Sequence, residues 1–489
     1  MNWRIKPLAD LFAAAERAPL QRSLGAFQLI MLGVSAVIGT GIFVLSAEAA
    51  QKAGPGMMVS FVLAAFTCAF TALCYAELAS MVPLSGSAYT YSYVVLGELI
   101  AWMVGWALIL EYAVAASAVS VGWSNYFVGL LERTFSIDIP DAFTRGPFAG
   151  GVINLPAVTI ALLMTALLII GTRTSATIKV VALVLFIALS LPVIQAGNFQ
   201  PFSPNGFFGE ISGMGIAGAA ASIFFAYIGF DAVSTAAEET RNPQRNMPIG
   251  VIGSLLVCTV FYLLVSAGAV GAVGAQPVID AATGMAFEPG STGLMTACGL
   301  PANAQAFACS PEPLAHVVSQ LGWRTASQFI GLAAFLAMPA VVLMMLFGQT
   351  RIFFAMARDR LLPFSESLTR LHPKFNTPYV VTLITGVAVT ALASVLPVGF
   401  LADISNTGTL FAFMTVAAGV IILRRRDPDR PRPFRTPAIW LLGPVALGSC
   451  AFLFLSLSSR TRTMFVCWTL AGLVVYALYG YRKSPLRQR

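Results

Sequence analysis

Long apolar segments, separated by short polar ones, constrain this chain more than any other feature. Hydrophobic residues make up 57% of its 489 positions and charged residues only 10%. Water-soluble domains carry about 25% charged residues, so the composition excludes a soluble, a disordered or a coiled-coil protein. A helix of about 20 apolar residues is long enough to cross a bilayer. We therefore expect an all-α integral membrane protein that has lipid as its solvent.

The apolar segments predict about twelve transmembrane helices. Their expected ranges are 26–49, 57–82, 96–130, 151–171, 174–197, 211–237, 247–274, 325–348, 378–397, 401–423, 437–458 and 461–481. No cleavage site of the signal-peptide type follows the first span, which is therefore expected to stay in the mature protein. Two short amphipathic segments, 84–95 and 353–368, are expected to lie between spans.

Lysine and arginine are distributed unevenly between the segments that connect these spans. With the N-terminus inside the cell, 22 of the 29 Lys and Arg residues fall on the inner side and six on the outer side. Cytoplasmic loops of membrane proteins carry such an excess. The pattern predicts a multi-pass protein of the cytoplasmic membrane with both termini in the cytoplasm. It also explains the net charge of +8 without a nucleic acid as partner.

Cysteine and histidine give no indication of a metal site or a cofactor. The seven cysteines and two histidines do not have the spacing of a zinc site. The sequence also has no phosphate-binding loop motif, which argues against an ATP-driven pump. Cys298 and Cys309 lie together in the longest polar segment, 275–324, which is predicted to face the outside. A disulfide between them is one expectation, and two reduced cysteines in a mobile loop are the other.

The first span contains two glycines around a hydroxyl residue. They occur in the sequence Gly33-Val-Ser-Ala-Val-Ile-Gly39-Thr40-Gly41-Ile-Phe43. Glycine weakens a helix. Lipid cannot satisfy the N–H and C=O groups of an unwound turn, so such a turn must face a cavity or a ligand. The pattern predicts an interruption of this helix at Gly39–Gly41.

The sixth span has a corresponding irregularity. Gly229 and Asp231 interrupt the apolar sequence FFAYIGFD, and an acid within a membrane span is a candidate functional residue. The first and sixth spans are five helices apart, which is the spacing of a 5+5 inverted repeat. Interrupted helices at corresponding positions of two halves indicate the substrate site of a secondary transporter. The alternative is two ordinary packing helices that are kinked by glycine.

Four longer motifs carry a resemblance to a family. The segments GVSAVIGTGIF, AYIGFDAVSTAAEETRNPQRNMPIG, GQTRIFFAMARDRLLP and LRRR…PRPFRTP resemble the cationic amino acid transporter family of the amino acid–polyamine–organocation superfamily. The resemblance covers nearly the whole chain except the segment 275–315. It implies a LeuT-like fold in which helices 1 and 6 are unwound at mid-membrane. The implied parts are a cytoplasmic segment 1–25, a transporter core 26–423, two further helices in 437–481 and a cytoplasmic tail 482–489.

The resemblance implies secondary active uptake of an amino acid across the cytoplasmic membrane, coupled to protons rather than sodium, by alternating access. It implies no enzymatic activity. Two alternatives stay open, namely an amino acid/polyamine exchanger without proton coupling and a non-transporting amino acid sensor. The residues expected near the substrate, Phe225, Ile228 and Met338, are apolar, so neutral amino acids are at least as good candidates as cationic ones.

The resemblance also implies which groups would bind the substrate. Backbone N–H groups at Gly39–Gly41 would meet the α-carboxylate, because the N-terminus of a helix favours an anion. Unpaired carbonyl groups at the ends of the half-helices would meet the α-ammonium group. The expected substrate-binding residues are Val37, Ile38, Gly39, Thr40, Gly41, Phe225, Ala226 and Ile228, with the ammonium at the carbonyls of Val37, Phe225 and Ile228. Candidates for the pocket or a gate are Tyr227, Asp231 and Met338.

Lys179 is the single charged residue of the fifth span. In the family that the chain resembles, a lysine on this helix takes the place of a sodium ion, which makes Lys179 a candidate for proton coupling. The alternative is a lysine that snorkels to the membrane surface near Arg173. The family carries adjacent hydroxyl residues on helix 8 that would face this lysine, whereas this chain has Pro339 and Ala340. A proline frees the carbonyl four residues earlier, so the Phe335 carbonyl is a candidate replacement for the missing hydroxyl partner.

Two acids lie within other spans. Glu111 in the third span is a second candidate for proton coupling, and it could pair with Lys179, join a water network or line the pocket. A structural, hydrogen-bonded glutamate is the alternative. Glu77 lies near the end of the second span and is interpreted as structural.

Overall fold

The computed structural model describes residues 24–82, 87–170, 177–231, 233, 240–375 and 377–484. Within these residues all regular secondary structure is helical, with two isolated β-bridges at Leu24–Thr240 and Ile279–Ala286. The predicted all-α class is therefore confirmed. The expected segment 1–25 and the end of the tail 482–489 lie almost entirely outside the described residues.

Seven helical segments are long and apolar enough to cross a membrane. Five are single helices: α7 (Glu98–Phe135), α12 (Pro243–Val273), α15 (Arg324–Arg358), α18 (Val398–Arg426) and α19 (Ile439–Ser456). In the sixth, α4 (Leu45–Ala53) is joined through η1 (Gly54–Gly56) to α5 (Met57–Met81). In the seventh, α20 (Ser459–Val475) continues through η8 (Tyr476–Gly480) into α21 (Tyr481–Lys483). Large apolar side chains on their outer faces are exposed, as expected for contact with lipid tails.

Shorter helices complete the bundle. The apolar ones are α2 (Ala26–Val37), α9 (Leu155–Ile170), α10 (Thr177–Ser190) with η3 (Leu191–Val193), α11 (Gly215–Ile223) with η5 (Phe224–Tyr227), and α17 (Tyr379–Val395). The remaining ones are α3 (Thr40–Phe43), α6 (Ser87–Val95), α8 (Asp141–Thr144), η2 (Pro147–Ala149), η4 (Ala196–Phe199), α13 (Thr292–Cys298), η7 (Phe307–Cys309), α14 (Pro313–Gln320) and α16 (Ser365–Leu368).

Each predicted span contains a helix, but two expectations need correction. The amphipathic segment 353–368 is not a separate element, because α15 continues without a break through Pro339 as far as Arg358. The first span is not one helix with an unwound centre but three helices, α2, α3 and α4, with a second irregularity at Val44 (φ −123°, ψ −51°). The sixth span is described only up to residue 233.

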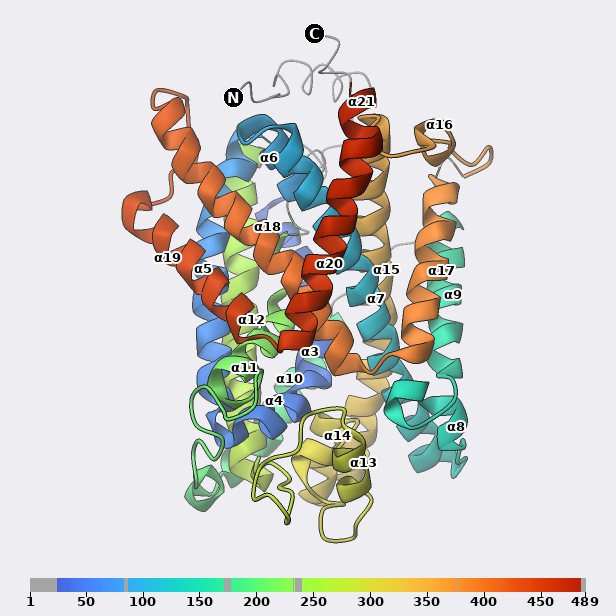
Figure 1. The fold of residues 1–489 in the computed structure, drawn as a ribbon. Helices are drawn as coiled ribbons and strands as arrows, with labels where there is room; N and C mark the ends of the chain where they lie inside the picture. Colours follow the sequence, from blue (N-terminus) through green and yellow to red (C-terminus); the bar gives the residue numbers. More distant parts are fainter. Residues whose placement is uncertain are drawn as a thin grey trace.

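The long helices pack in pairs that are distant in the sequence. α7 packs against α15, α5 against α12, and α9 against α17. α2 and α11 lie with α5 and α12, whereas α18 packs mainly on α7. In Figure 1, α19 and α20 lie at the periphery, with α21 at one end of the bundle and α13 and α14 at the other. We call these two ends the α21 end and the α14 end.

The polar segment between α12 and α15 forms a compact cap at the α14 end. Cys298 and Cys309 are joined by a disulfide, with a Cα–Cα distance of 5.5 Å. The buried Gln51 side chain of α4 makes three hydrogen bonds to the cap, two donated to the Val278 and Phe287 carbonyls at 2.9 Å each and one accepted from Val278 N–H at 2.8 Å. The cap is therefore attached to the helix that follows the first interruption.

Candidate substrate site

The first helix is interrupted between α2 and α3. Ile38 is extended (φ −73°, ψ 104°), as is Gly39 (φ −161°, ψ −144°), and α3 begins at Thr40. The hydrogen bonds of α3 begin at Ile42, whose N–H donates to the Gly39 carbonyl at 3.3 Å. Among the described residues, none accepts a hydrogen bond from the N–H groups of Gly39, Thr40 or Gly41. These are the three amides that the sequence assigns to an anion.

The second interruption follows α11. The helix tightens into η5, and the chain then becomes extended at Ile228 (φ −61°, ψ 135°). Gly229 has φ +121°, a conformation that residues with a Cβ rarely adopt. Its N–H donates to Asp231 Oδ1 at 3.3 Å. The sequence correctly places this irregularity, and Asp231 belongs to the turn itself.

The two interruptions touch each other through their glycines. A Cβ added at Gly41 would lie 2.2 Å from Ala226 Cα, and one added at Gly229 would lie 2.9 Å from the Ala36 carbonyl carbon. Two backbones approach this closely only where a side chain is missing. Gly41 is therefore required for packing of α3 on η5, a role that the sequence did not reveal.

The carbonyl groups at the end of α2 have a nearly complete set of protein donors. Val34 O accepts from Ile38 N–H at 3.0 Å, and Ser35 O accepts from the Lys179 ammonium group at 2.7 Å. Val37 O lies 2.9 Å from the hydroxyl of Tyr262 on α12. The sequence predicts that Val37 O binds the substrate ammonium. It does not predict the contact with Tyr262, because a single tyrosine in an apolar helix looks like an ordinary core or interface residue.

Lys179 is fully buried on α10 and lies against the end of α2. Among the described residues no carboxylate lies within ion-pair distance of its amine, so pairing with Glu111 is not observed. A hydrogen bond between Lys179 and the expected replacement partner, the Phe335 carbonyl, is not observed either among the described residues. The Phe335 carbonyl that Pro339 frees accepts a hydrogen bond from Trp123 Nε1 at 2.9 Å. The carbonyl thus has the Trp123 indole of α7 as its donor. The order of residues along α15 does not predict this contact with another helix.

Glu111 lies on α7 in a buried setting of its own. Its backbone carbonyl accepts from the Ser405 hydroxyl at 3.2 Å, and Gly408 of α18 packs against its Cβ. Neither carboxyl oxygen has a hydrogen-bond donor in normal geometry among the described residues. The neighbouring Tyr112 hydroxyl donates to Asp231 Oδ2 at 3.1 Å. The two acids therefore lie in one buried region where α7 meets the second interruption.

Apart from Asp231 and Glu111, the side chains described next to the interruptions are apolar. Phe225 and Ile228 are 5% and 3% exposed, and a Cβ on Gly39 would lie 3.2 Å from the Val341 side chain of α15. The Thr40 hydroxyl lies 3.8 Å from the Met338 sulfur. Met338 is thus next to the first interruption, as expected. These walls suit an uncharged side chain.

Tyr227 differs from the other pocket candidates. Its hydroxyl donates to the Phe61 carbonyl of α5 at 3.2 Å, and its ring lies edge-on to Tyr262 at 5.2 Å between centroids. The side chain is fully buried. It anchors η5 to α5.

A cavity of about 490 Å³ opens at the α14 end and reaches Val44 and Leu45, directly beyond α3. A group of charged residues borders it, which we call the Lys52 cluster. Lys52 Nζ lies 2.9 Å from Glu48 and 3.3 Å from Asp403, and it also contacts the Ser222 hydroxyl, which donates to Asp403. In the sequence analysis Lys52 is only one of the six Lys and Arg residues on the outer side. This cluster was therefore not predicted.

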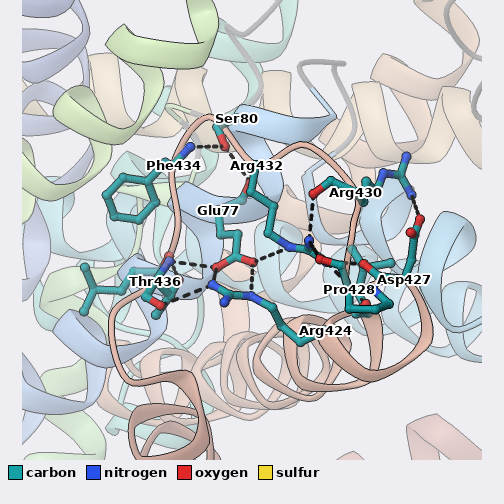
Figure 2. Close-up of polar contacts among 11 residues, drawn as sticks. Glu77, Ser80, Arg424, Asp427, Pro428, Arg430, Arg432, Phe434 and Thr436 are labelled. Atoms are coloured by element: carbon teal, nitrogen blue, oxygen red, sulfur yellow. Dashed lines mark hydrogen bonds and ion pairs between the residues drawn. The ribbon is translucent and has the colours of Figure 1, made fainter.

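A second group of charges lies at the α21 end and is shown in Figure 2. In this Glu77 cluster, Arg424 of α18 donates two hydrogen bonds to the Glu77 carboxylate, at 2.8 and 2.7 Å. The Thr436 N–H donates a third at 2.8 Å, and Arg432 forms an ion pair at 3.3 Å. The cluster fixes the segment between α18 and α19 to the end of α5.

Two interrupted helices touch at their glycines, and the amides of Gly39, Thr40 and Gly41 have no acceptor among the described residues. Interrupted helices within a bundle of apolar helices are typical of membrane transport proteins. The chain belongs to the amino acid permease family, whose sequence profile matches residues 24–478. This confirms the family that the motifs resemble, and the family consists of transporters rather than enzymes.

Relatives within the family differ in their named substrates. The chain is 44% identical to the branched-chain amino acid permease BcaP of Bacillus subtilis (strain 168) and 39% identical to the methylthioribose transporter of the same organism, with 99% of both chains covered in each case. It is 33% identical to the vacuolar cationic amino acid transporter 4 of Arabidopsis thaliana, over 84% of this chain and 64% of that protein.

Proposed function

We propose that this protein is a secondary active transporter that takes up a neutral aliphatic amino acid, coupled to protons, by alternating access. The observation that carries the proposal is the group of three amides at Gly39, Thr40 and Gly41, which have no acceptor among the described residues and lie beside apolar walls. Free amides at the start of a helix bind an anion such as an α-carboxylate. The walls then admit an uncharged side chain.

The identity of the side chain rests on chemistry and on one relative. A cationic side chain would need an acid or carbonyls at its end, and the wall residues Phe225, Ile228 and Met338 offer none. The Asp231 carboxylate at the second interruption already accepts hydrogen bonds from Gly229 N–H and the Tyr112 hydroxyl. A likeness of 44% to a permease named for branched-chain amino acids supports the same class here. A methylthioribose substrate is the second candidate, since a transporter named for it is 39% identical. That sugar has no α-carboxylate, so it would leave the three amides without an anion.

Helix pairing supports the inverted repeat and a motion between two bodies. The pairs α5–α12, α7–α15 and α9–α17 each join helices that are five spans apart in the predicted order, as repeat partners would be. α2, α5, α11 and α12 form one group around the interruptions. α7, α9, α15, α17 and α18 form the other. Rocking of the first group against the second would expose the site to each side in turn.

The excess of Lys and Arg assigns the α21 end to the cytoplasm and the α14 end to the outside. The cavity beside the Lys52 cluster is then the outer entrance. The cap between α12 and α15 lies beside this entrance, and several of its residues line the cavity. A disulfide in the cap is stable in an oxidising exterior.

Lys179 supports proton coupling rather than sodium coupling. Its buried amine braces the end of α2, which leads directly into the substrate amides. A protonated amine holds the Ser35 carbonyl more strongly than a neutral one, because charged hydrogen bonds are about twice as strong. Loss of the proton would therefore loosen α2 and favour a different state. Exchange without protons and a sensor role are the alternatives.

Uptake into proteoliposomes tests the proposal. We expect labelled leucine to accumulate when the lumen is made alkaline in sodium-free buffer, and isoleucine and valine to compete while arginine and methylthioribose do not. Exchange only against preloaded amino acid would instead indicate an exchanger, and binding without uptake a sensor. Competition by methylthioribose at the level of leucine would contradict the amino acid assignment.

A further inference from the structure

Tyr262 of α12 connects the two interrupted helices through a single hydroxyl group. Its oxygen lies 2.9 Å from Val37 O at the end of α2 and 2.8 Å from Ala226 O in η5. The side chain is fully buried. These two carbonyls come from the two halves of the proposed site, 189 positions apart in the numbering of the chain, and no other described side chain bonds to both.

The hydroxyl cannot satisfy both carbonyls at once. A tyrosine has one O–H proton to donate, and a carbonyl oxygen can only accept. At any moment one of the two carbonyls therefore lacks this donor, in a place where an unsatisfied acceptor is costly. The arrangement holds two acceptors close together with one proton between them, and a second donor would complete it.

The ring of Tyr262 is held in place by its neighbours. It packs against Tyr227 at 5.2 Å and Phe61 at 5.9 Å between ring centroids. Both are fully buried. The Tyr262 hydroxyl therefore has a fixed position, and it sets the separation of the two carbonyls.

We propose that Tyr262 is the positioning residue of the ammonium half of the site. It donates to one of the two carbonyls and leaves the other, Val37 O or Ala226 O, for the α-ammonium group of the substrate. This inference rests on the proposed function and names the part of the site that recognises an amine. A substrate with an α-ammonium group supplies the missing donor, whereas a neutral sugar cannot supply a charged one.

Removal of the hydroxyl alone tests this assignment. In proteoliposomes, Tyr262→Phe should raise the KM for leucine about five- to tenfold, as expected for one lost hydrogen bond, while the maximal rate stays within about twofold. Tyr89→Phe is the matched control, because it removes a buried hydroxyl of α6 that lies outside the proposed site and donates to Asp359 Oδ2 at 2.8 Å. Its KM should stay within about twofold of wild type. An unchanged KM in Tyr262→Phe would overturn the inference.

A second measurement separates positioning from general packing. 4-Methylpentanoate is leucine without its amine, and we expect it to inhibit wild-type uptake about 10- to 100-fold more weakly than leucine does. In Tyr262→Phe this ratio should shrink at least threefold, because the carbonyls are no longer held for the amine. In Tyr89→Phe it should stay as in wild type. An unchanged or larger ratio in Tyr262→Phe would overturn the inference, because independent effects add.

The two proposals fail differently. If the wild-type protein transports no amino acid, the proposed function fails and with it the premise of this inference. If the wild type transports leucine but the Tyr262→Phe variant behaves like wild type, only the positioning role fails. Elution of each variant as a monodisperse peak in detergent shows that it is folded.

Discussion

The two charge clusters both tie the first helices to α18, but they do so in different ways. In the Glu77 cluster the carboxylate is 1% exposed and is bonded by two arginines and a backbone amide. In the Lys52 cluster all contacts run between side chains, and the cluster borders a cavity. Water in this cavity can reach the edge of the Lys52 cluster, whereas the carboxylate at the centre of the Glu77 cluster is closed off. We infer that the Glu77 cluster holds α5 and α18 together permanently at the α21 end. The contacts between α4 and α18 in the Lys52 cluster, at the α14 end, can break and form again.

Removal of the charge at Glu77 tests this difference between the two clusters with the largest expected effect. Glu77→Gln keeps the shape of the side chain but leaves the buried Arg424 without a counter-charge. Loss of one partner of a buried ion pair costs about 3–5 kcal/mol, so we expect a strongly lowered unfolding temperature in detergent or no folded protein. Glu366→Gln, at an exposed position of α16, is the control. Equal unfolding temperatures for the two variants would contradict a fastening role.

The matching change in the Lys52 cluster should have a smaller effect on stability. Lys52→Met leaves Glu48 and Asp403 without their cation, but the cavity lets water solvate them. We expect a loss of about 1–2 kcal/mol, between the values for surface and buried pairs, together with a changed rate of uptake. The unfolding temperature and the uptake rate measure the two effects. A destabilisation as large as that of Glu77→Gln would show that both clusters are static.

A third ion pair extends the comparison to the pH dependence of stability. Arg133 of α7 pairs with the nearly buried Glu312 of the cap. Burial raises the pKa of the Glu312 carboxyl from 4.5 to about 7, although Arg133 acts in the opposite direction. The folded protein then binds more protons than the unfolded one between pH 4.5 and about 7, so this carboxyl makes stability fall as pH rises through that window.

Thermal unfolding between about pH 5 and pH 8 measures this slope. We expect the unfolding temperature of the wild type to fall with rising pH more than that of Glu312→Gln, which has no proton to lose. Above about pH 7 the two curves should run parallel. Identical slopes over the whole range would mean that Glu312 does not titrate in this window.

Local sequence patterns predicted the helices and their interruptions. Which residues of distant helices contact each other could be learned only from the structure. The interruption at Gly39 follows from a property of two glycines and their neighbours in the chain, so it could be recognised there. The contact of Gly41 with Ala226 depends on how two helices meet. Nothing around Gly41 distinguishes a glycine that admits a ligand from one that admits a neighbouring helix.

Long-range polar contacts show the same limit. Lys52 and Asp403 are 351 positions apart, and Tyr262 and Val37 are 225 apart. Each looks like an isolated polar residue in its own segment. Lys179 could be recognised from the sequence, because a lone charge in an apolar span is expensive, but its bond to the Ser35 carbonyl could not be predicted. Trp123 occupies the Phe335 carbonyl, and only the packing of α7 on α15 decides that.

Accumulation of labelled leucine in proteoliposomes under an imposed pH gradient tests the central claim most directly, when wild type is compared with Lys179→Met. This variant keeps an apolar stem of similar length and removes the amine that bonds to Ser35 O, and the exposed Lys374→Met serves as control. We predict that Lys179→Met loses gradient-driven accumulation but still exchanges internal for external leucine, while the control behaves like wild type. Accumulation by Lys179→Met at the wild-type level would contradict the claim that this lysine couples transport to protons.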